Sequence, residues 1–148
     1  ACEYVFSREA FEEVGGFVDF PAAWCSDDAS WVALAGDSEI VTLGTAKVNW
    51  RRSGINISSP GSSLGSAKVD AMVAYLEWLA ARNMTVTSGS SGNWFRSVLR
   101  EQGQVVGTLR HMRAARAIHR LDGSWWPICY LSLVSNDVLA VARRHKPA

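Results

Sequence analysis

Residues 11–31 have the sequence FEEVGGFVDFPAAWCSDDASW, and the signals in this stretch decide how the neighbouring segments fold. Gly15-Gly16 predicts the end of a short helix with a Schellman-type stop, because glycine readily adopts the left-handed conformation that this stop requires. Residues 17–24 are mostly large and apolar but follow neither a helical nor a strand period, which predicts a packed loop. We therefore expect a short helix, an aromatic loop and a second helix, in this order.

The second helix is expected to begin at Ser26, whose hydroxyl is a favourable N-cap, and to end at Gly36. Asp27 and Asp28 then occupy its first two positions, where the helix dipole favours negative charge. Two interpretations of these acids remain open at this point. They stabilise a helix end, or one of them acts as a general base beside the aromatic loop.

The composition is that of one globular unit in a reducing compartment. The chain has 148 residues, 48% of them hydrophobic, which is enough for one substantial core. Its three cysteines, Cys2, Cys25 and Cys129, are widely spaced and odd in number, which argues against a disulfide framework. No close pairing of cysteines with one another or with histidine occurs, which argues against a structural zinc site.

Short runs of β-branched and aromatic residues predict three strands, Tyr4–Phe6, Glu39–Leu43 and Ala46–Trp50. The last two runs are joined at Gly44-Thr45 and are expected to form a hairpin or a pair of adjacent strands. Residues 51–66 contain six serines, three glycines and one proline, which predicts a loop.

The rest of the chain is predicted to be helical. Residues 68–82 carry apolar side chains at helical spacing: Val69, Met72, Val73, Leu76 and Leu79. Residues 93–120 predict a long basic helix, which Gly103 and Gly107 weaken and are able to divide. Its expected apolar side consists of Phe95, Val98, Leu99, Val105, Val106, Leu109 and Met112. A last helix is expected from about residue 126 to residue 144, with Pro127 in its first turn.

These elements predict an α/β fold class in which a few strands are followed by a helical C-terminal region. The boundary is expected between residues 66 and 67, so that 1–66 and 67–148 form the two parts. So few strands do not complete a parallel-sheet domain, and the first predicted strand needs a pairing partner. The chain is therefore expected to be a piece of a longer protein.

Charge is divided unevenly between the two ends of the chain. Residues 1–81 contain 5 Lys and Arg against 11 Asp and Glu, whereas residues 82–148 contain 10 against 3. The basic part suits a solvated or membrane-facing helical surface. Nucleic acid is not expected as a partner, because aromatic side chains are not interleaved with these basic residues. Polar residues at the centre of 126–144 make that segment a poor transmembrane span.

Two motifs in the N-terminal part resemble a known family. The first is Phe6–Phe17, FSREAFEEVGGF, and the second is Ser26–Trp31, SDDASW. Together with Lys47–Gly54, KVNWRRSG, they are similar to the C-terminal part of the catalytic domain of family 2 glycosyltransferases, which have a GT-A-type fold. The resemblance covers about residues 1–60, and it implies that residues 1–66 are the acceptor-side part of such a domain. The helical remainder matches only the habit of these enzymes of adding variable C-terminal helices.

The resemblance implies roles for specific residues. The aspartate of the acidic pair is the usual base of an inverting sugar transfer, and its four-residue spacing to Trp31 selects Asp27, with Asp28 as the near alternative. Trp24 and Trp31 would shield this base from water and offer a platform for sugar rings. A basic loop that closes on the donor diphosphate or on the acceptor is implied for Arg51, Arg52 and Ser53.

The resemblance also implies partners. Family members bind a nucleotide-sugar donor and a divalent cation, magnesium or manganese, through an N-terminal half whose Asp-x-Asp motif does not occur in this sequence. The implied acceptor is a glycan or a lipid-linked molecule, as in polysaccharide biosynthesis. We expect a cytoplasmic enzyme, with peripheral contact at the inner face of the membrane left open, and we expect the isolated chain to be inactive.

A hypothesis from a different class stands beside this one. Residues 82–148 are also suited to a non-catalytic helical module that binds another protein or a membrane surface. The coding sequence before Ala1 discriminates between the two hypotheses. An upstream half with an Asp-x-Asp motif supports the transferase, whereas a Met directly before Ala1 favours the module.

Overall fold

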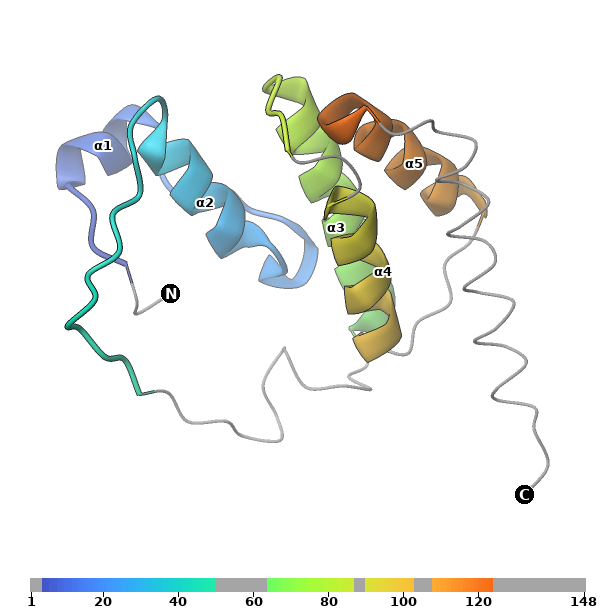
Figure 1. Ribbon diagram of the computed structural model, residues 1–148, viewed down its shortest axis with the longest axis horizontal. Helices are drawn as coiled ribbons and strands as arrows, with labels where there is room; N and C mark the ends of the chain where they lie inside the picture. Colours follow the sequence, from blue (N-terminus) through green and yellow to red (C-terminus); the bar gives the residue numbers. More distant parts are fainter. Residues whose placement is uncertain (1–3, 50–63, 87–89, 103–107, 124–148) are drawn as a thin grey trace.

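The computed structural model describes residues 4–49, 64–86, 90–102 and 108–123, and within these ranges the chain is helical (Figure 1). The elements are α1 (Arg8–Glu13), the 3₁₀ turn η1 (Pro21–Ala23), α2 (Ser26–Ala35), α3 (Gly65–Ala81), α4 (Ser90–Gln102) and α5 (Thr108–Asp122). Figure 1 shows α1 and α2 on one side of the molecule, and α3, α4 and α5 gathered as a bundle on the other.

Helix α1 is short because local hydrogen bonds fix both of its ends. The Ser7 hydroxyl accepts a hydrogen bond from the Ala10 backbone N–H at 3.1 Å and caps the first turn. At the other end, the Gly16 N–H donates to the Phe11 carbonyl, and the Gly15 N–H donates to the carbonyl of the residue that follows Phe11. This pair of bonds is a Schellman motif, and Gly15 has the left-handed φ of +81° that it requires. The predicted glycine stop is confirmed.

The predicted N-cap of α2 is wrong by one residue. Cys25 occupies the N-cap position with a left-handed φ of +63°, and Ser26 is the first residue inside the helix. The Ser26 hydroxyl instead accepts a hydrogen bond from the Phe20 N–H at 2.9 Å. Because this hydroxyl fastens the preceding loop, it does not cap the helix. Asp27 and Asp28 therefore occupy the second and third helical positions rather than the first two.

An aromatic cluster holds α1 and α2 together. The Trp31 ring stacks on the Tyr4 ring with centroids 4.3 Å apart, and it also contacts Phe6 and Phe17. Phe11 of α1 meets Phe17 at 4.8 Å in an edge-to-face arrangement. Several of these rings keep one side in solvent, and Phe17 is 58% exposed. The N-terminal part is thus held by ring contacts that enclose only a small interior.

The main core lies between α3, α4 and α5. Its fully buried members include Met72 and Leu76 from α3, Phe95 from α4 and Ile118 from α5. The apolar spacing predicted for α3 is confirmed, since four of the five expected positions are buried and the fifth, Leu79, packs against the core. Small side chains on α5 let the long helices approach closely: Ala114, Ala115 and Ala117 are all buried.

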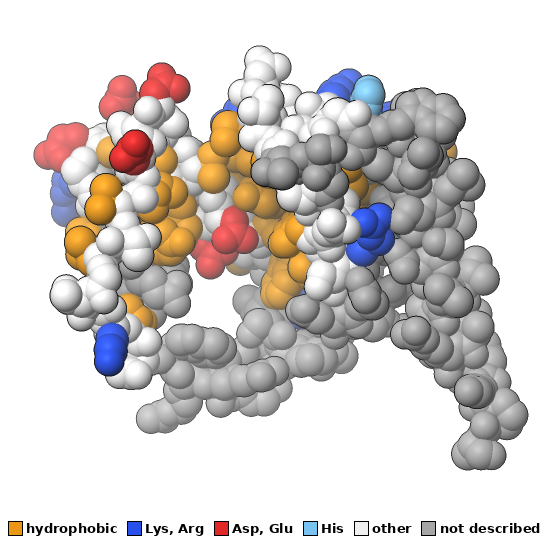
Figure 2. Space-filling model, in the orientation of Figure 1, with side chains coloured by type: hydrophobic (Ala, Val, Ile, Leu, Met, Phe, Trp, Pro, Cys, Tyr) orange, Lys and Arg blue, Asp and Glu red, His pale blue; other side chains and the backbone are white. Residues whose placement is uncertain are grey.

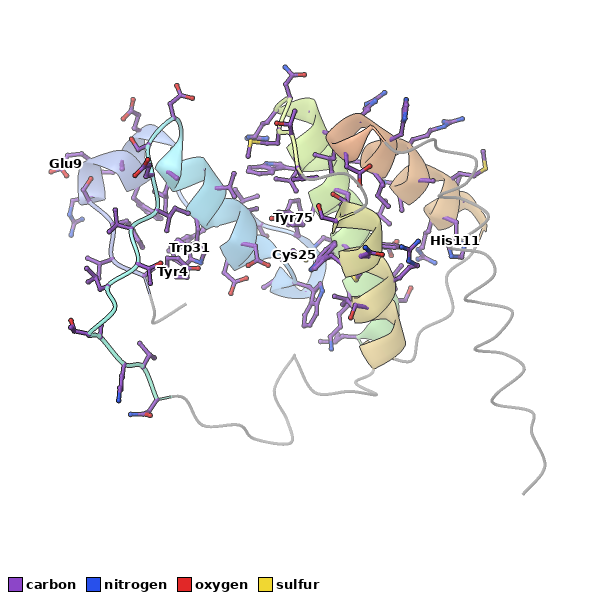
Figure 3. All side chains as sticks on the ribbon, viewed as in Figure 1. Tyr4, Glu9, Cys25, Trp31, Tyr75 and His111 are labelled. Carbon is purple, nitrogen blue, oxygen red and sulfur yellow. The ribbon has the colours of Figure 1, made fainter. Side chains whose placement is uncertain are left out.

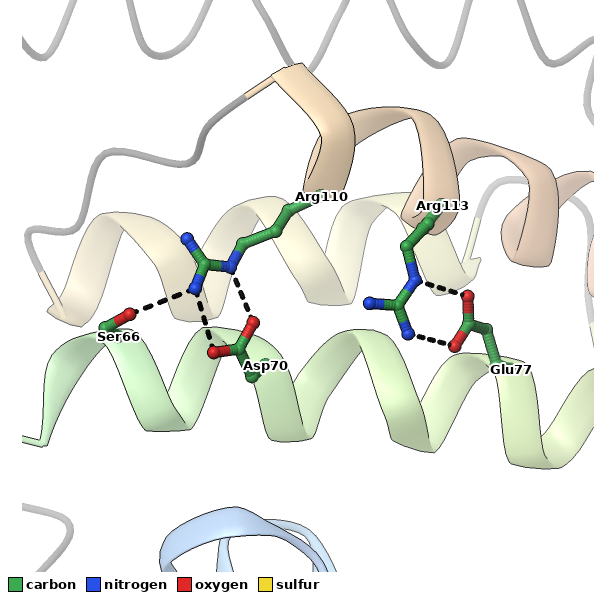
Figure 4. Close-up of polar contacts among 5 residues, drawn as sticks. All are labelled: Ser66, Asp70, Glu77, Arg110 and Arg113. Atoms are coloured by element: carbon green, nitrogen blue, oxygen red, sulfur yellow. Dashed lines mark hydrogen bonds and ion pairs between the residues drawn. The ribbon is translucent and has the colours of Figure 1, made fainter.

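Two bidentate ion pairs cross from α5 to α3 at the edge of this core (Figure 4). The Arg110 guanidinium donates to both carboxylate oxygens of Asp70, at 2.6 and 2.8 Å. Arg113 donates in the same way to Glu77, at 2.9 and 2.6 Å. Both pairs remain partly exposed, so they fix the register of the two helices more than they stabilise the fold.

The loop around η1 joins the N-terminal part to the bundle. Cys25 is buried within the main core, and Phe20 and Trp24 pack against it. The Phe20 ring meets the Tyr75 ring of α3 edge-on, with centroids 6.2 Å apart. Figure 2 shows hydrophobic side chains gathered on the facing sides of the two parts, with acidic side chains between them.

The α/β fold class predicted from the sequence is wrong for the part of the chain that the structure describes, because that part contains helices and no strands. The predicted strand residues within it, 4–6, 39–43 and 46–49, have no ladder partner. A turn does form between the last two, where the Ala46 N–H donates to the Leu43 carbonyl at 3.2 Å. The apolar residues that suggested strands are largely exposed, among them Val5 at 98% and Val41 at 75%. β-Propensity without a pairing partner does not produce a strand.

Other expectations are corrected in the helical part. Gly65 and Ser66 belong to the first turn of α3, so the loop predicted to reach residue 66 ends earlier. The helix predicted over 93–120 is divided, as its two glycines allow: α4 ends at Gln102 and α5 begins at Thr108. Leu109, expected on the apolar side, is 71% exposed.

Some predicted elements lie outside the described residues, including the helix expected over 126–144 and most of the loop expected over 51–66. Among the helices that are described, none is both long enough and apolar enough to cross a lipid bilayer.

Candidate functional site

The acidic pair lies in the first turn of α2, directly after the loop that contacts α3. Asp27 is exposed, and its Oδ1 accepts a hydrogen bond from the Asp28 N–H at 3.1 Å. Asp28 is also exposed as a residue, but partial burial of its carboxyl, and after it the charge of Asp27, raise the pKa of this group. A carboxylate with a raised pKa is a stronger proton acceptor.

Two weakly acidic groups share the environment of Asp28. Burial raises the pKa of the Cys25 thiol to about 12, with smaller contributions from Asp28 and Asp27. Burial also raises the pKa of the Tyr75 phenol to about 12, and Asp28 and Cys25 add to this rise. Figure 3 shows the labelled Cys25 and Tyr75 close together between α2 and α3. Both groups stay protonated at neutral pH, so the negative charge of this region rests on the acidic pair.

Trp24 lies beside a buried cation. The Nζ atom of Lys68, on α3, is 4.6 Å from the centroid of the Trp24 ring, which is a cation–π distance. Lys68 is fully buried, and this burial lowers the pKa of its ammonium group. The ring face that Trp24 turns toward Lys68 is therefore occupied by the ammonium and is not open to a sugar.

Trp31 lies in a different environment from Trp24. It is 7% exposed and belongs to the aromatic cluster with Tyr4 and Phe6. Among the described aromatic residues, no ring contact links Trp31 to Trp24. The structure places Trp24 against the bundle beside Lys68, and it places Trp31 in the cluster that holds α2 and α1 together.

The backbone just before the acidic pair is strained. Ala22, Ala23 and Cys25 have φ values of +57°, +53° and +63°, a region that residues with a Cβ atom rarely adopt. Each such residue costs about 1–2 kcal/mol relative to an ordinary conformation. Strain of this kind persists where the surrounding structure imposes it, and it is concentrated at functional sites. The strained loop fixes the direction in which α2 begins, and with it the position of Asp28.

Two residues of this region, Lys68 and Tyr75, have no place in the sequence-based prediction of the site. A signal for Lys68 was present, because it precedes Met72 and Leu76 at four-residue intervals and so lies on the apolar face of its helix. A lysine on such a face is either buried or directed past the core toward its edge. Tyr75 gave no comparable signal, since a tyrosine beside an apolar face is ordinary.

The remaining predicted site residues, Arg51, Arg52 and Ser53, lie outside the described residues. The described residues do not fit a divalent cation, because no three His, Cys, Asp or Glu side chains gather within them. Comparison of the chain with protein-family models, with curated proteins and with solved structures gave no match.

Proposed function

We propose that this chain contributes the acceptor-side residues of a glycosyltransferase that uses a nucleotide-sugar donor, with Asp28 as the general base. The observation that carries the proposal is the raised pKa of Asp28, whose carboxyl lies in the first turn of α2, directly after the loop that contacts α3. The resemblance of residues 6–17 and 26–31 to family 2 glycosyltransferases supports the reaction class. Asp27, which the spacing to Trp31 selects, is the alternative base.

The proposed reaction is a single displacement that inverts the anomeric carbon. The acceptor hydroxyl oxygen attacks that carbon, and an Asp28 carboxylate oxygen takes the hydroxyl proton as the new C–O bond forms. The bond to the nucleoside diphosphate breaks, and its electron pair leaves with the phosphate oxygen. Arg51 and Arg52, with Ser53 beside them, are proposed to hold the diphosphate by charge-assisted hydrogen bonds.

Within this proposal, the two tryptophans act by positioning. Trp24 packs against the main core and so holds the loop that leads into the acidic turn. Trp31 anchors α2 in the aromatic cluster and so fixes the direction of its first turn. Neither ring needs to contact the sugar directly.

The exposed apolar segments support a further part of the proposal, which is that a second half of the enzyme covers the N-terminal part. Val5 is 98% exposed and Val41 is 75% exposed, and neighbours such as Leu43 are similarly uncovered. Apolar surface of this extent is unfavourable in water and is typical of an interface. The covering half would bind the nucleotide-sugar and its magnesium or manganese ion. The small and odd number of widely spaced cysteines supports a cytoplasmic location.

The test compares Asp28→Asn with Asp27→Asn in the full-length parent enzyme. We expect Asp28→Asn to lower kcat by about 10²-fold or more while the Kd for the nucleotide-sugar stays unchanged, because general-base catalysis contributes about 10²–10⁴-fold. Asp27→Asn is expected to keep most of its turnover. Normal turnover in the Asp28→Asn variant would show that Asp28 is not the general base. Loss of turnover in Asp27→Asn alone would transfer the role to Asp27.

A further inference from the structure

Helix α5 carries three arginines along one face, Arg113, Arg116 and Arg120, at spacings of three and four residues. All three side chains are exposed. They line a surface hollow of about 190 Å³ between α5 and α3, whose other lining residues are Glu77, Ala80 and Ala117. The hollow is remote in sequence from the acidic pair, and neither Asp27 nor Asp28 lines it.

The one carboxylate in the hollow is already matched. Both oxygens of Glu77 accept hydrogen bonds from Arg113, at 2.9 and 2.6 Å (Figure 4). This pairing holds the Arg113 guanidinium in one orientation and neutralises the charge of Glu77. The lining therefore keeps the two positive charges of Arg116 and Arg120.

The positive charges of Arg116 and Arg120 are not neutralised by a described carboxylate. Among the described residues, no ion pair involves Arg116 or Arg120. They are four residues apart on one helix face, where like charges repel. The helix dipole favours Arg120, which lies in the last turn, but it offers nothing to Arg116 in the middle of α5. An anion between the two guanidinium groups would remove this repulsion.

The floor of the hollow leaves room for such an anion. Ala80 and Ala117 are buried and small, so among the described residues no bulky side chain lines the space between the arginines and α3. Guanidinium groups present planar pairs of N–H donors that match phosphate oxygens. Aromatic rings, which single-stranded nucleic acid needs for stacking, do not line the hollow.

We propose that the hollow between α3 and α5 binds a phosphate group. Arg116 and Arg120 would donate hydrogen bonds to the phosphate oxygens, and Arg113, held in place by Glu77, would line the third side of the site. The ligand is a phosphorylated small molecule or the phosphate of a lipid headgroup. The proposal does not depend on the glycosyltransferase function, because it uses none of the residues of the acidic site.

The test uses the intact chain and two probes. Pyrophosphate binding is measured by calorimetry, and vesicle binding is measured by co-sedimentation with an equal mixture of phosphatidylglycerol and phosphatidylcholine, against phosphatidylcholine alone. We expect the double variant Arg116→Gln/Arg120→Gln to bind the effective probe about tenfold more weakly or worse, since one charge-assisted hydrogen bond is worth about a factor of ten. The control Arg8→Gln removes an exposed arginine on α1 and should bind normally.

Each outcome either identifies the source of the phosphate or overturns the proposal. Arginine-dependent binding of pyrophosphate assigns a soluble phosphate ligand, and arginine-dependent binding to the anionic vesicles alone assigns a lipid headgroup. Binding to neither probe overturns the proposal, as does binding that Arg8→Gln weakens equally. Preferential binding of a single-stranded oligonucleotide through the same arginines would also overturn it. If the glutamine variant unfolds, Arg116→Lys/Arg120→Lys keeps the charge, loses the planar fork, and should still bind measurably more weakly than the wild type.

Discussion

The side-chain ammonium of Lys68, fully buried on α3, lies 4.6 Å from the ring centroid of Trp24 in the loop that precedes α2. This contact joins the N-terminal part to the bundle through a cation and an aromatic face. Burying an ammonium group is unfavourable unless nearby groups compensate it, and the lowered pKa of Lys68 reflects this cost. The position of the loop therefore depends on a charge as well as on apolar packing.

A double-mutant cycle measures this contact. Lys68→Met keeps most of the side-chain volume and removes the charge, and Trp24→Leu removes the aromatic face. We expect a coupling of about 1–2 kcal/mol between them in the free energy of unfolding, because the pair is desolvated. The cycle cancels the other interactions of Lys68, and urea denaturation supplies the four free energies. Additive effects of the two substitutions would show that the ring does not stabilise the ammonium.

Because the pKa of Asp28 is raised, replacing this residue should increase the free energy of unfolding by an amount that depends on pH. An unfolded aspartate has a pKa of about 3.9, and the folded value is higher, so stability falls as the pH rises through this interval. Asp28→Asn should therefore increase the free energy of unfolding at pH 7, by less than about 1 kcal/mol because the group is partly exposed. The gain should vanish below about pH 4. The exposed Asp19→Asn serves as the control in urea titrations at both pH values, and an equal gain there would contradict the assignment.

The strained loop predicts an unusual effect of glycine. Ala23 is exposed with a φ of +53°, so Ala23→Gly removes strain without removing a packed side chain. We expect it to raise the free energy of unfolding by about 0.5–1 kcal/mol. Ala33→Gly, in the middle of α2, should instead lower it by about 0.5–1 kcal/mol. Thermal or urea unfolding compares the two variants, and destabilisation by both would indicate that the loop is not strained.

Truncations on α4 and α5 distinguish the core from the surface. Phe95 is fully buried, so Phe95→Ala should cost about 3–5 kcal/mol in the free energy of unfolding. Leu109 is 71% exposed, and Leu109→Ala should change stability by no more than about 0.5 kcal/mol. Sequence periodicity places both residues on one apolar face. Equal losses of unfolding free energy in the two variants, measured by chemical denaturation, would show that Leu109 is buried as that pattern predicts.

The Schellman motif predicts that replacing a glycine by alanine lowers the free energy of unfolding at Gly15 and not at Gly44. Gly15 has a φ of +81° and an added Cβ would meet no atom within 4 Å, so Gly15→Ala suffers only from its backbone conformation. We expect a loss of about 1–2 kcal/mol in the free energy of unfolding. Gly44 has equally open surroundings and no left-handed φ, so Gly44→Ala should be nearly neutral. Circular dichroism melts of the two variants test this difference.

Short-range signals predicted the helical part of the fold well. Ser7, Gly15 and Gly16 define α1 through bonds within a few residues, and the apolar spacing from Val69 to Leu79 identifies the core face of α3. Such features depend on local geometry, so they survive whatever surrounds them. Strand predictions failed in the described residues because a strand depends on a partner that local sequence does not supply.

The site was predictable only in part for the same reason. The acidic pair was found from its position at a helix start, but the raised pKa of Asp28 arises from partial burial in the folded chain and from the charge of Asp27. Lys68 and Tyr75 are more than thirty residues away from the pair in the sequence, and only the folded chain brings them near it. The shift of the N-cap from Ser26 to Cys25 likewise depends on a tertiary demand, the hydrogen bond from the Phe20 N–H.

The narrow joint at the η1 loop has a consequence for motion. Cys25 is fully inserted into the main core, whereas Phe20 and Trp24 only pack against its edge. Undocking this loop exposes far less apolar surface than unfolding the bundle, so it requires less free energy. Undocking would remove the partial burial that raises the pKa of the Asp28 carboxyl, and we expect this pKa to fall when it occurs. The basicity of this carboxylate is thus coupled to a hinge, and slower amide exchange in α3 than in α2 would be its visible trace.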